Sequence, residues 1–311
     1  MQFRTIKELI RRMKTKFALL LFLSAFLTAG KTFSQDSTDL LNLVGKDQPK
    51  KEYVYGAFKS PRVIMSHSIE MLRPGVLDFR ILHRFGRVNG GAYEFFGLDG
   101  PATVRLGLDY GVTDNLTVGI GHSAFNKEID GFVKYRLIHQ ATGPKASPIS
   151  LIAVAGSTIT TLKWSDPTRQ NYFSSRVAYY GQAIVGRKFS EALSLQLIPS
   201  IVHRNLVPTV NDPNDLYAIG AGGRIKLSHR VSFNIDYHYI VNQNDAAGYH
   251  NPLSIGFDLE TGGHVFQLHF TNSKGMNERA FLANTEYSWG DGDIFFGFNI
   301  SRSFQIKKKK G

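Results

Sequence analysis

A histidine and a serine are adjacent at His122 and Ser123, and these residue types together can carry nucleophilic acyl transfer. The pair lies in a stretch that alternates apolar and polar residues, and neighbouring residues of a strand point to opposite faces. The two side chains therefore cannot share one hydrogen bond, and we interpret the pair as a coincidence. The sequence also has no G-x-S-x-G elbow, no H-E-x-x-H pair and no Walker loop. We therefore predict that the protein is not an enzyme and has no catalytic residues.

Metal chemistry is the second candidate, because His238 and His269 lie in segments that also carry Asp236 and Asp258. Residues spread over separate strands have no spacing that defines a tetrahedral site, so a hydrogen-bonded network is the interpretation we favour. The loop acids lack the D-x-D-x-D-G spacing of a calcium loop, and we interpret them as solvated charges; they are Asp212, Asp215, Asp291 and Asp293. The chain has no cysteine, which excludes thiolate sites and disulfides. We predict no metal and no cofactor.

A third set of residues shares one phase of the alternation. These charged or imidazole side chains would all point to the same face of their strands, opposite the apolar residues. They are Arg80, Arg84, Arg105, Asp109, Lys134, Arg136, Arg224, Lys226, Asp236, His238, Asp258 and Glu260.

The elements that position these residues have a period of two. The stretch from Arg105 to Gly121 places Leu106, Leu108 and Tyr110 on one face, turns at Thr113-Asp114-Asn115, and then resumes the alternation. Similar segments recur to Phe304, about twelve in all and each roughly ten residues long, which is the length of a strand that crosses a bilayer at a tilt. From this phase we expect the following residues to face lipid: Leu108, Tyr110, Val118, Ile120, Phe257 and Phe298.

The connections alternate in length. Thr113-Asp114-Asn115, Ser190-Glu191-Ala192, Ser228-His229-Arg230 and Thr261-Gly262-Gly263 are very short, whereas most of the others are long and rich in Gly, Pro, Asn and Asp. Short turns at one end and long loops at the other are typical of outer-membrane barrels with both termini in the periplasm. We predict an all-β fold, a transmembrane antiparallel up-and-down barrel with short periplasmic turns and longer extracellular loops. A secreted β-sandwich is the alternative.

The N-terminus has the pattern of a signal peptide. A basic region ending at Lys16 precedes the apolar stretch Phe17 to Gly30, and Thr32 and Ser34 are small residues at the positions read by a signal peptidase. We predict a signal peptide over 1–34, a periplasmic segment over 35–75, a barrel over 76–306 and a basic tail over 307–311. Within the second region, Phe58 to Leu72 is either a further strand or a segment that lies in the lumen or caps the periplasmic mouth. An even strand number favours the latter.

Four stretches together resemble a family of Bacteroidetes outer-membrane β-barrels catalogued as a domain of unknown function. They are "FKSPRVIMSHSIEML", "LDFRILHRFG", "GVTDNLTVGIGHS" and "DGFVKYRL". The resemblance extends from about Phe58 to Phe304. It implies a barrel in the outer membrane of a Gram-negative bacterium, and it implies neither catalytic residues nor a substrate.

The charges suggest the function. Arg80, Arg105 and Lys134 would share one wall, whereas Asp236 and Asp258 would lie on a different arc, so the two walls would create a field across a channel. The alternative is a charge network that fills a narrow barrel. We expect a porin-like channel for small polar or anionic solutes, with a mild anion preference, or else a structural, assembly or surface-interaction barrel without an open pore.

The expected partners follow from this location. They are outer-membrane lipid and lipopolysaccharide, the barrel-assembly machinery and periplasmic chaperones, and a small polar solute. The net charge of +12 comes largely from the two ends of the chain, so we expect no nucleic-acid partner.

Overall fold

The computed structural model describes residues 50–243 and 248–307. The chain divides by its contacts into two units, Met1–Gln48 and Pro49–Gly311, and every described residue belongs to the second. The expected signal peptide lies outside the described residues. None of the helices among the described residues is long and apolar enough to cross a membrane.

Twelve antiparallel strands form one closed barrel, in which each strand pairs with its neighbour in sequence. The first, β2, pairs with the last, β14, through contacts such as Ile81↔Ile300, so no strand edge is left open. The strands are β2 (Val76–Arg87), β3 (Thr103–Gly111), β4 (Leu116–Ser123), β5 (Glu128–Ile138), β7 (Ser150–Thr160), β8 (Val177–Lys188), β9 (Leu193–Arg204), β10 (Asp215–Lys226), β11 (Val231–Ile240), β12 (Leu253–Thr261), β13 (His264–Thr271) and β14 (Phe295–Gln305).

The outer face of the barrel is apolar. Leu108 on β3 pairs with Ile120 on β4, and Phe257 on β12 pairs with Leu268 on β13. These four side chains are all exposed on the outer surface. A belt of exposed hydrocarbon on neighbouring strands is the surface that such barrels present to lipid, which agrees with the outward phase predicted from the sequence.

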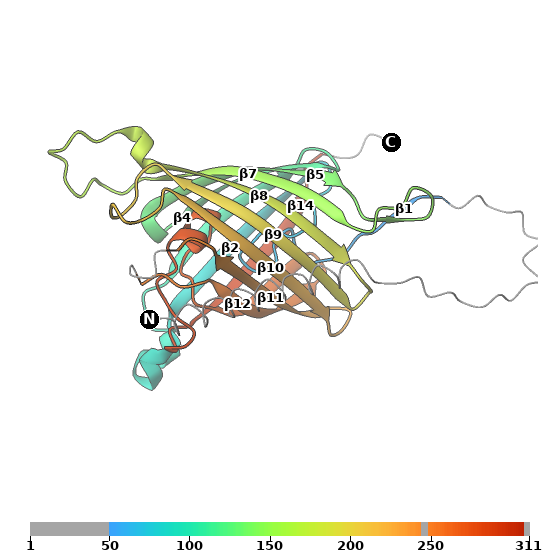
Figure 1. The fold of residues 1–311 in the computed structure, drawn as a ribbon. Helices are drawn as coiled ribbons and strands as arrows, with labels where there is room; N and C mark the ends of the chain where they lie inside the picture. Colours follow the sequence, from blue (N-terminus) through green and yellow to red (C-terminus); the bar gives the residue numbers. More distant parts are fainter. Residues whose placement is uncertain (1–49, 244–247, 308–311) are drawn as a thin grey trace, which may run out of the picture. The chain divides into compact units, whose positions relative to one another are not determined.

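The two ends of the barrel differ as expected. At one end, tight turns join β3 to β4, β8 to β9, β10 to β11 and β12 to β13. Gly262 adopts a positive φ of 51° in the last of these turns, a conformation that glycine allows without steric cost. The long connections gather at the opposite end, away from β1 (Figure 1). We call the short-turn end periplasmic and the other extracellular, following the usual orientation of outer-membrane barrels.

Two segments outside the barrel strands position the site. The chain enters at the periplasmic end through β1 (Glu52–Tyr53), which pairs with β6 (Ala141–Thr142) in the connection between β5 and β7. It then passes into the barrel as residues 58–72, which we call the plug. At the extracellular end, the loop between β13 and β14 carries a short helix, α2 (Glu278–Ala283), whose residues are almost all buried.

Candidate functional site

The plug lies inside the barrel and is not a strand of it. Its central residues, Val63 to Ser68, are at most 2% exposed. Its only strand-like contact among the described residues is an isolated bridge between Arg62 and His67, so the chain folds back on itself. Of the two alternatives that the alternation left open, the structure has the segment in the lumen.

Inward-facing carboxylate and amide groups bind the plug backbone. Asp236 on β11 accepts backbone N–H groups of Met65 and Ser66, both at 2.9 Å, and of Ile64 at 3.3 Å. Gln196 on β9 accepts the N–H of Ile69 and donates to the carbonyl of His67. A segment without regular structure has no internal ladder for its polar groups, so the barrel wall must supply their partners.

Other plug carbonyls accept from further wall side chains. Lys134 Nζ on β5 donates to the carbonyls of Pro61 and Glu70, at 3.2 and 2.6 Å. Arg224 Nη1 on β10 donates to the carbonyls of Gly56 and Ala57, just before the plug. Gln267 on β13 and Asn299 on β14 donate to the carbonyls of Val63 and Ile64. The plug is therefore held from strands around the barrel.

The basic arc of the wall contains its own acids. Arg105 on β3 forms a two-point ion pair with Asp130 on β5, including an Nε–Oδ1 hydrogen bond of 2.9 Å. Arg80 lies 2.7 Å from Asp78 and 3.8 Å from Asp109. The expected separation into a basic wall and an acidic wall is thus wrong on this arc. Buried charges require close partners, and the strands of the basic arc supply carboxylates for Arg80 and Arg105.

Glycines on the inner face make room for this arc. A Cβ at Gly121 would collide with the guanidinium of Arg105, and a Cβ at Gly107 would lie 2.9 Å from Arg105 Nη1. The Arg105 side chain thus lies across two neighbouring glycines. This explains Gly107 and Gly121, two of the inward glycines in the alternating stretch Arg105 to Gly121.

The extracellular loop contacts the plug inside the barrel. Arg62 of the plug donates to Glu278 of α2 at 2.8 Å, and His67 lies 3.2 Å from the same carboxylate oxygen. Glu128 on β5 binds Asn277 and Arg279 of this loop. The ion pairs join the plug, α2 and the barrel wall into one network.

The arc from β7 to β9, next to β5, carries much of the buried hydrocarbon of the interior. Ile152, Ile184 and Ile198, on β7, β8 and β9, are completely buried. They belong to one hydrophobic cluster with plug residues such as Ile64 and Met65 and with Phe281 of α2. The plug therefore has both a polar and a hydrocarbon interface with the barrel.

Two interior cavities are very small, whereas a pocket of about 270 Å³ remains at the periplasmic end, between the ends of the plug and strands β13 and β14. One of the small cavities lies next to Arg80 and Asn299 and the other next to Arg204 and Leu282, and each holds about 10 Å³. A volume of that size accommodates about one water molecule. In the described conformation, the plug and the inward loop fill these parts of the barrel.

The structure places most of the predicted site residues in the interior. Those that are buried are Arg80, Arg84, Arg105, Asp109, Lys134, Arg136, Arg224, Asp236, His238 and Asp258. Lys226 is half-exposed and Glu260 is exposed, so placing these two in the lumen was wrong. Both have the inward phase, but they stand at the periplasmic ends of their strands, where the wall meets water; there Glu260 pairs with Lys59.

Several of the other polar residues with predicted chemistry lie in ordinary hydrogen bonds and ion pairs. His122 is exposed and Ser123 is buried, so the two do not form a dyad. His238 Nε2 lies 3.1 Å from Asp236 Oδ1, within the hydrogen-bond network that holds the plug. Of the loop acids, Asp215 pairs with His203 and Asp293 with Arg87.

Several functional residues were missed from the sequence. Asp130 and Glu128 share the inward phase of Lys134 and Arg136 on the same strand, so the alternation contained the signal and a longer strand would have included them. Gln196, Gln267 and Asn299 were missed because uncharged amides were not considered. The loop residues Glu278 and Arg279 have no periodic signal, because a loop that folds inward leaves no alternation.

The family model described as "Membrane bound beta barrel domain (DUF5777)" matches residues 58–304. That range begins at the first residue of the plug, so the family domain contains both the plug and the barrel. No curated protein sequence matches the chain.

Several solved structures are similar at low sequence identity. The NanC porin is 9% identical with a TM-score of 0.47, and the alignment covers 73% of this chain and 98% of that one. The KdgM porin is 8% identical with a TM-score of 0.44, covering 74% and 99%. OmpT, an outer membrane protein of Vibrio cholerae, is 11% identical with a TM-score of 0.35, covering 75% and 99%.

The family match covers most of the chain, and the structure is a closed antiparallel barrel with an even strand number and an apolar outer belt. Single-chain barrels of this construction are proteins of bacterial outer membranes. The chain therefore belongs to the DUF5777 family of membrane-bound β-barrel domains, and it is an outer-membrane β-barrel protein.

Proposed function

We propose that this protein is a gated outer-membrane channel for small polar or anionic solutes, closed in the described conformation by its own plug. The supporting observation concerns the hydrogen-bond partners of two cationic side chains of the barrel wall. Lys134 and Arg224 form no ion pair with a described carboxylate, and their hydrogen bonds go to backbone carbonyls of the plug and of the residues just before it. When the plug moves aside, these cations would face a water-filled lumen.

The hydrogen bonds of the plug support a reversible closure. Most bonds between the plug and the wall join a wall side chain to a plug backbone group, and water can replace both partners when the lumen opens. The net contribution of such a bond is only about 0.5–1.5 kcal/mol, or about 1.5–3 kcal/mol where one partner is charged. The closed state is therefore held by many individually modest contacts.

The second candidate is a structural or assembly barrel without an open pore. The buried hydrocarbon of the β7–β9 arc favours it, because removal of the plug would expose Ile152, Ile184 and Ile198 to water. Exposed hydrocarbon costs about 25 cal/mol per Å². In this alternative the interior is a permanent core, and the function lies in the exposed loops or at the periplasmic end.

Conductance in planar bilayers separates the two candidates. The full chain should be silent or nearly so, and a variant lacking residues 58–72 should conduct. A reversible lock provides a test that leaves the plug intact. A Cβ at Gly222 would lie 3.0 Å from Val63 Cγ2, so Val63→Cys with Gly222→Cys is placed to form a disulfide between plug and wall. The natural chain has no cysteine to interfere.

The locked protein should stay closed under conditions that open the natural chain, such as urea below its unfolding transition, and should open after reduction. Each single-cysteine variant serves as the matched control. If the folded deletion variant and the reduced double variant both fail to conduct, the channel proposal is wrong and the structural candidate is the better account.

A further inference from the structure

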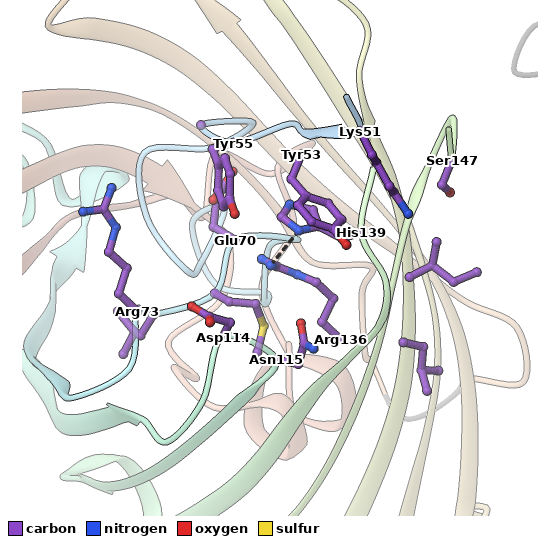
Figure 2. Close-up of a pocket in the computed structure, with 15 residues that line it drawn as sticks. Lys51, Tyr53, Tyr55, Glu70, Arg73, Asp114, Asn115, Arg136, His139 and Ser147 are labelled. Atoms are coloured by element: carbon purple, nitrogen blue, oxygen red, sulfur yellow. Dashed lines mark hydrogen bonds between the residues drawn. The ribbon is translucent and has the colours of Figure 1, made fainter. Parts of the chain in front are cut away.

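A large pocket at the periplasmic mouth is separate from the closed interior. It holds about 620 Å³, a volume typical of sites for small molecules. Figure 2 shows that its lining comes from segments far apart in the chain: the entering segment at Tyr53 and Tyr55, the end of the plug at Glu70, the β3–β4 turn at Asp114, and the end of β5 at Arg136.

The central cation of this pocket has no carboxylate partner. Arg136 is 7% exposed, and its Nη1 contacts His139 Nδ1 at 3.2 Å. Its Nε is buried without a hydrogen-bond partner, and within the described ranges no carboxylate forms an ion pair with it. Arg105, by contrast, is buried with Asp130 as its counter-ion. A buried guanidinium without an anion is costly, and a bound anion would remove that cost.

The charges around Arg136 favour an anion over a cation. Lys51 and Arg73 also line the pocket, and neither forms an ion pair with a carboxylate among the described residues. The two acids of the lining are Glu70 and Asp114. Glu70 already accepts the backbone N–H groups of Ala57 and Phe58, at 2.5 and 3.3 Å, so its charge is partly compensated.

Two tyrosines provide an apolar surface beside these charges. Tyr53 stacks on the ring of His139, with centroids 4.7 Å apart and planes within 13°. Tyr55 meets the same ring edge-on at 4.9 Å and is 64% exposed. Half-exposed rings next to a buried cation suit a ligand that has an anionic head and an organic body.

We propose that the mouth pocket is a binding site for a small organic anion. The carboxylate or phosphate group of the ligand pairs with Arg136, whose planar guanidinium suits either oxyanion. The organic body of the ligand packs against Tyr55. This site is accessible from the periplasm while the plug is in place. The inference therefore goes beyond the proposed channel and holds whether or not the barrel conducts.

Calorimetric titration of the full folded chain in detergent micelles tests this proposal. Benzoate and phenyl phosphate are the probes, and benzyl alcohol is the neutral control of similar size. We expect both anions to bind at low ionic strength and benzyl alcohol not to bind. Arg136→Gln should weaken binding of either anion at least about tenfold, since a charge-assisted hydrogen bond contributes about 1.5–3 kcal/mol.

Arg230→Gln is the matched control, because Arg230 is exposed in the β10–β11 turn at the same end of the barrel and does not line the pocket. It should leave the affinity unchanged. Tyr55→Ala covers the case in which Arg136→Gln does not fold, since the exposed Tyr55 ring can be removed without opening the core. Tyr55→Ala should weaken the binding of phenyl phosphate more than the binding of inorganic phosphate.

Three results would overturn the inference. The first is that neither benzoate nor phenyl phosphate binds at millimolar concentration. The second is equal binding of benzyl alcohol. The third is an equal loss of affinity in Arg230→Gln, which would mean that only the net charge of the surface matters. The ratio of the benzoate and phenyl phosphate affinities identifies which oxyanion the site prefers.

Discussion

The buried ion pair between Arg105 and Asp130 shows how a charged residue is accommodated within the barrel wall. The guanidinium lies over Gly107 and Gly121, and Asp130 reaches it from the strand beyond β4. Both side chains are about 1% exposed, so neither can be solvated if its partner is lost. The pair contributes to stability mainly because each member compensates the charge of the other.

Asp130→Asn should therefore destabilise the barrel strongly. Loss of one member of a buried pair costs about 3–5 kcal/mol, because the remaining charge is uncompensated. Unfolding titrations of the refolded protein in liposomes measure this loss. Asp114→Asn, in an exposed turn, should change stability little. The double variant Arg105→Met with Asp130→Leu should recover most of the stability, and a stable Asp130→Asn protein would contradict the argument.

At the scale of elements, the entering segment is attached to the barrel by β1, by β6 and by one histidine. His139 Nε2 lies 2.9 Å from the carbonyl of Val54 and His139 Nδ1 lies 3.2 Å from Arg136 Nη1. A carbonyl only accepts and a guanidinium only donates, so these partners require a neutral imidazole with its proton on Nε2. Burial, and then the nearby charges of Arg136 and Lys51, lower the pKa of His139 below its usual value, while the hydrogen bond to Val54 opposes that shift.

The attachment should consequently weaken in acid. Because the pKa of His139 is lower when the segment is docked, the stabilisation is complete above about pH 6.5, the ordinary histidine value, and is lost as pH falls below it. Hydrogen exchange of residues 52–55 should accelerate between pH 7.5 and 5, after correction for the intrinsic rates. His139→Gln should abolish this extra pH dependence. If the variant shows the same pH profile as the natural chain, another titrating group is responsible.

The outer face of the strands makes a separate prediction about elements. Leu108 pairs with Phe79 and Ile120, so its neighbours on both adjacent strands are apolar and it lies within the lipid belt. Leu108→Arg should cost about 2–4 kcal/mol if this position is near the bilayer midplane. Ala192→Arg adds the same charge at an exposed periplasmic turn and should be tolerated. The folding yield into liposomes is measured by gel mobility. If the two variants insert equally well, the outward assignment of Leu108 is wrong.

The elements were predicted well from sequence, and the contents of the barrel were not. Alternation along each strand determines which face meets lipid, so the strand set and residues such as Leu108 and Arg105 could be placed without coordinates. Asp130 was missed although it shares the inward phase of Lys134 on the same strand. Neither the docking of Met65 on Asp236 nor the inward turn of Glu278 has a periodic signal. Contacts between irregular segments and a wall depend on packing in three dimensions, which spacing along the chain does not encode.

At the scale of the whole molecule, the interior holds the plug by two kinds of contact. Polar and charged side chains hold the plug from β5, β9, β11, β13 and β14, and hydrocarbon from β7 to β9 also packs against it. The interior of such barrels is typically polar, either as a water-filled channel or filled by a plug. The combination is consistent with a barrel that is stable when closed and retains a charged path along one arc.

The charge of that path predicts its ion selectivity once the plug is removed. Lys134 loses the plug carbonyls as partners, Arg224 has only the carbonyls of Gly56 and Ala57 just before the plug, and Arg84 has no ion pair among the described residues even when the plug is present. Asp236 and Glu278 also lose their plug partners. Their negative charges therefore offset part of the positive charge along the path. The variant lacking residues 58–72 should therefore show a modest anion preference in reversal potentials. Salt screens charges over about 10 Å at 0.1 M, so the preference should fade as ionic strength rises.

In the same background, Lys134→Gln with Arg224→Gln should shift the reversal potential toward cations, whereas Arg230→Gln at the rim should not. If the two lumen substitutions leave the reversal potential unchanged, ions do not pass along this arc, and the conducting path must run elsewhere in the barrel.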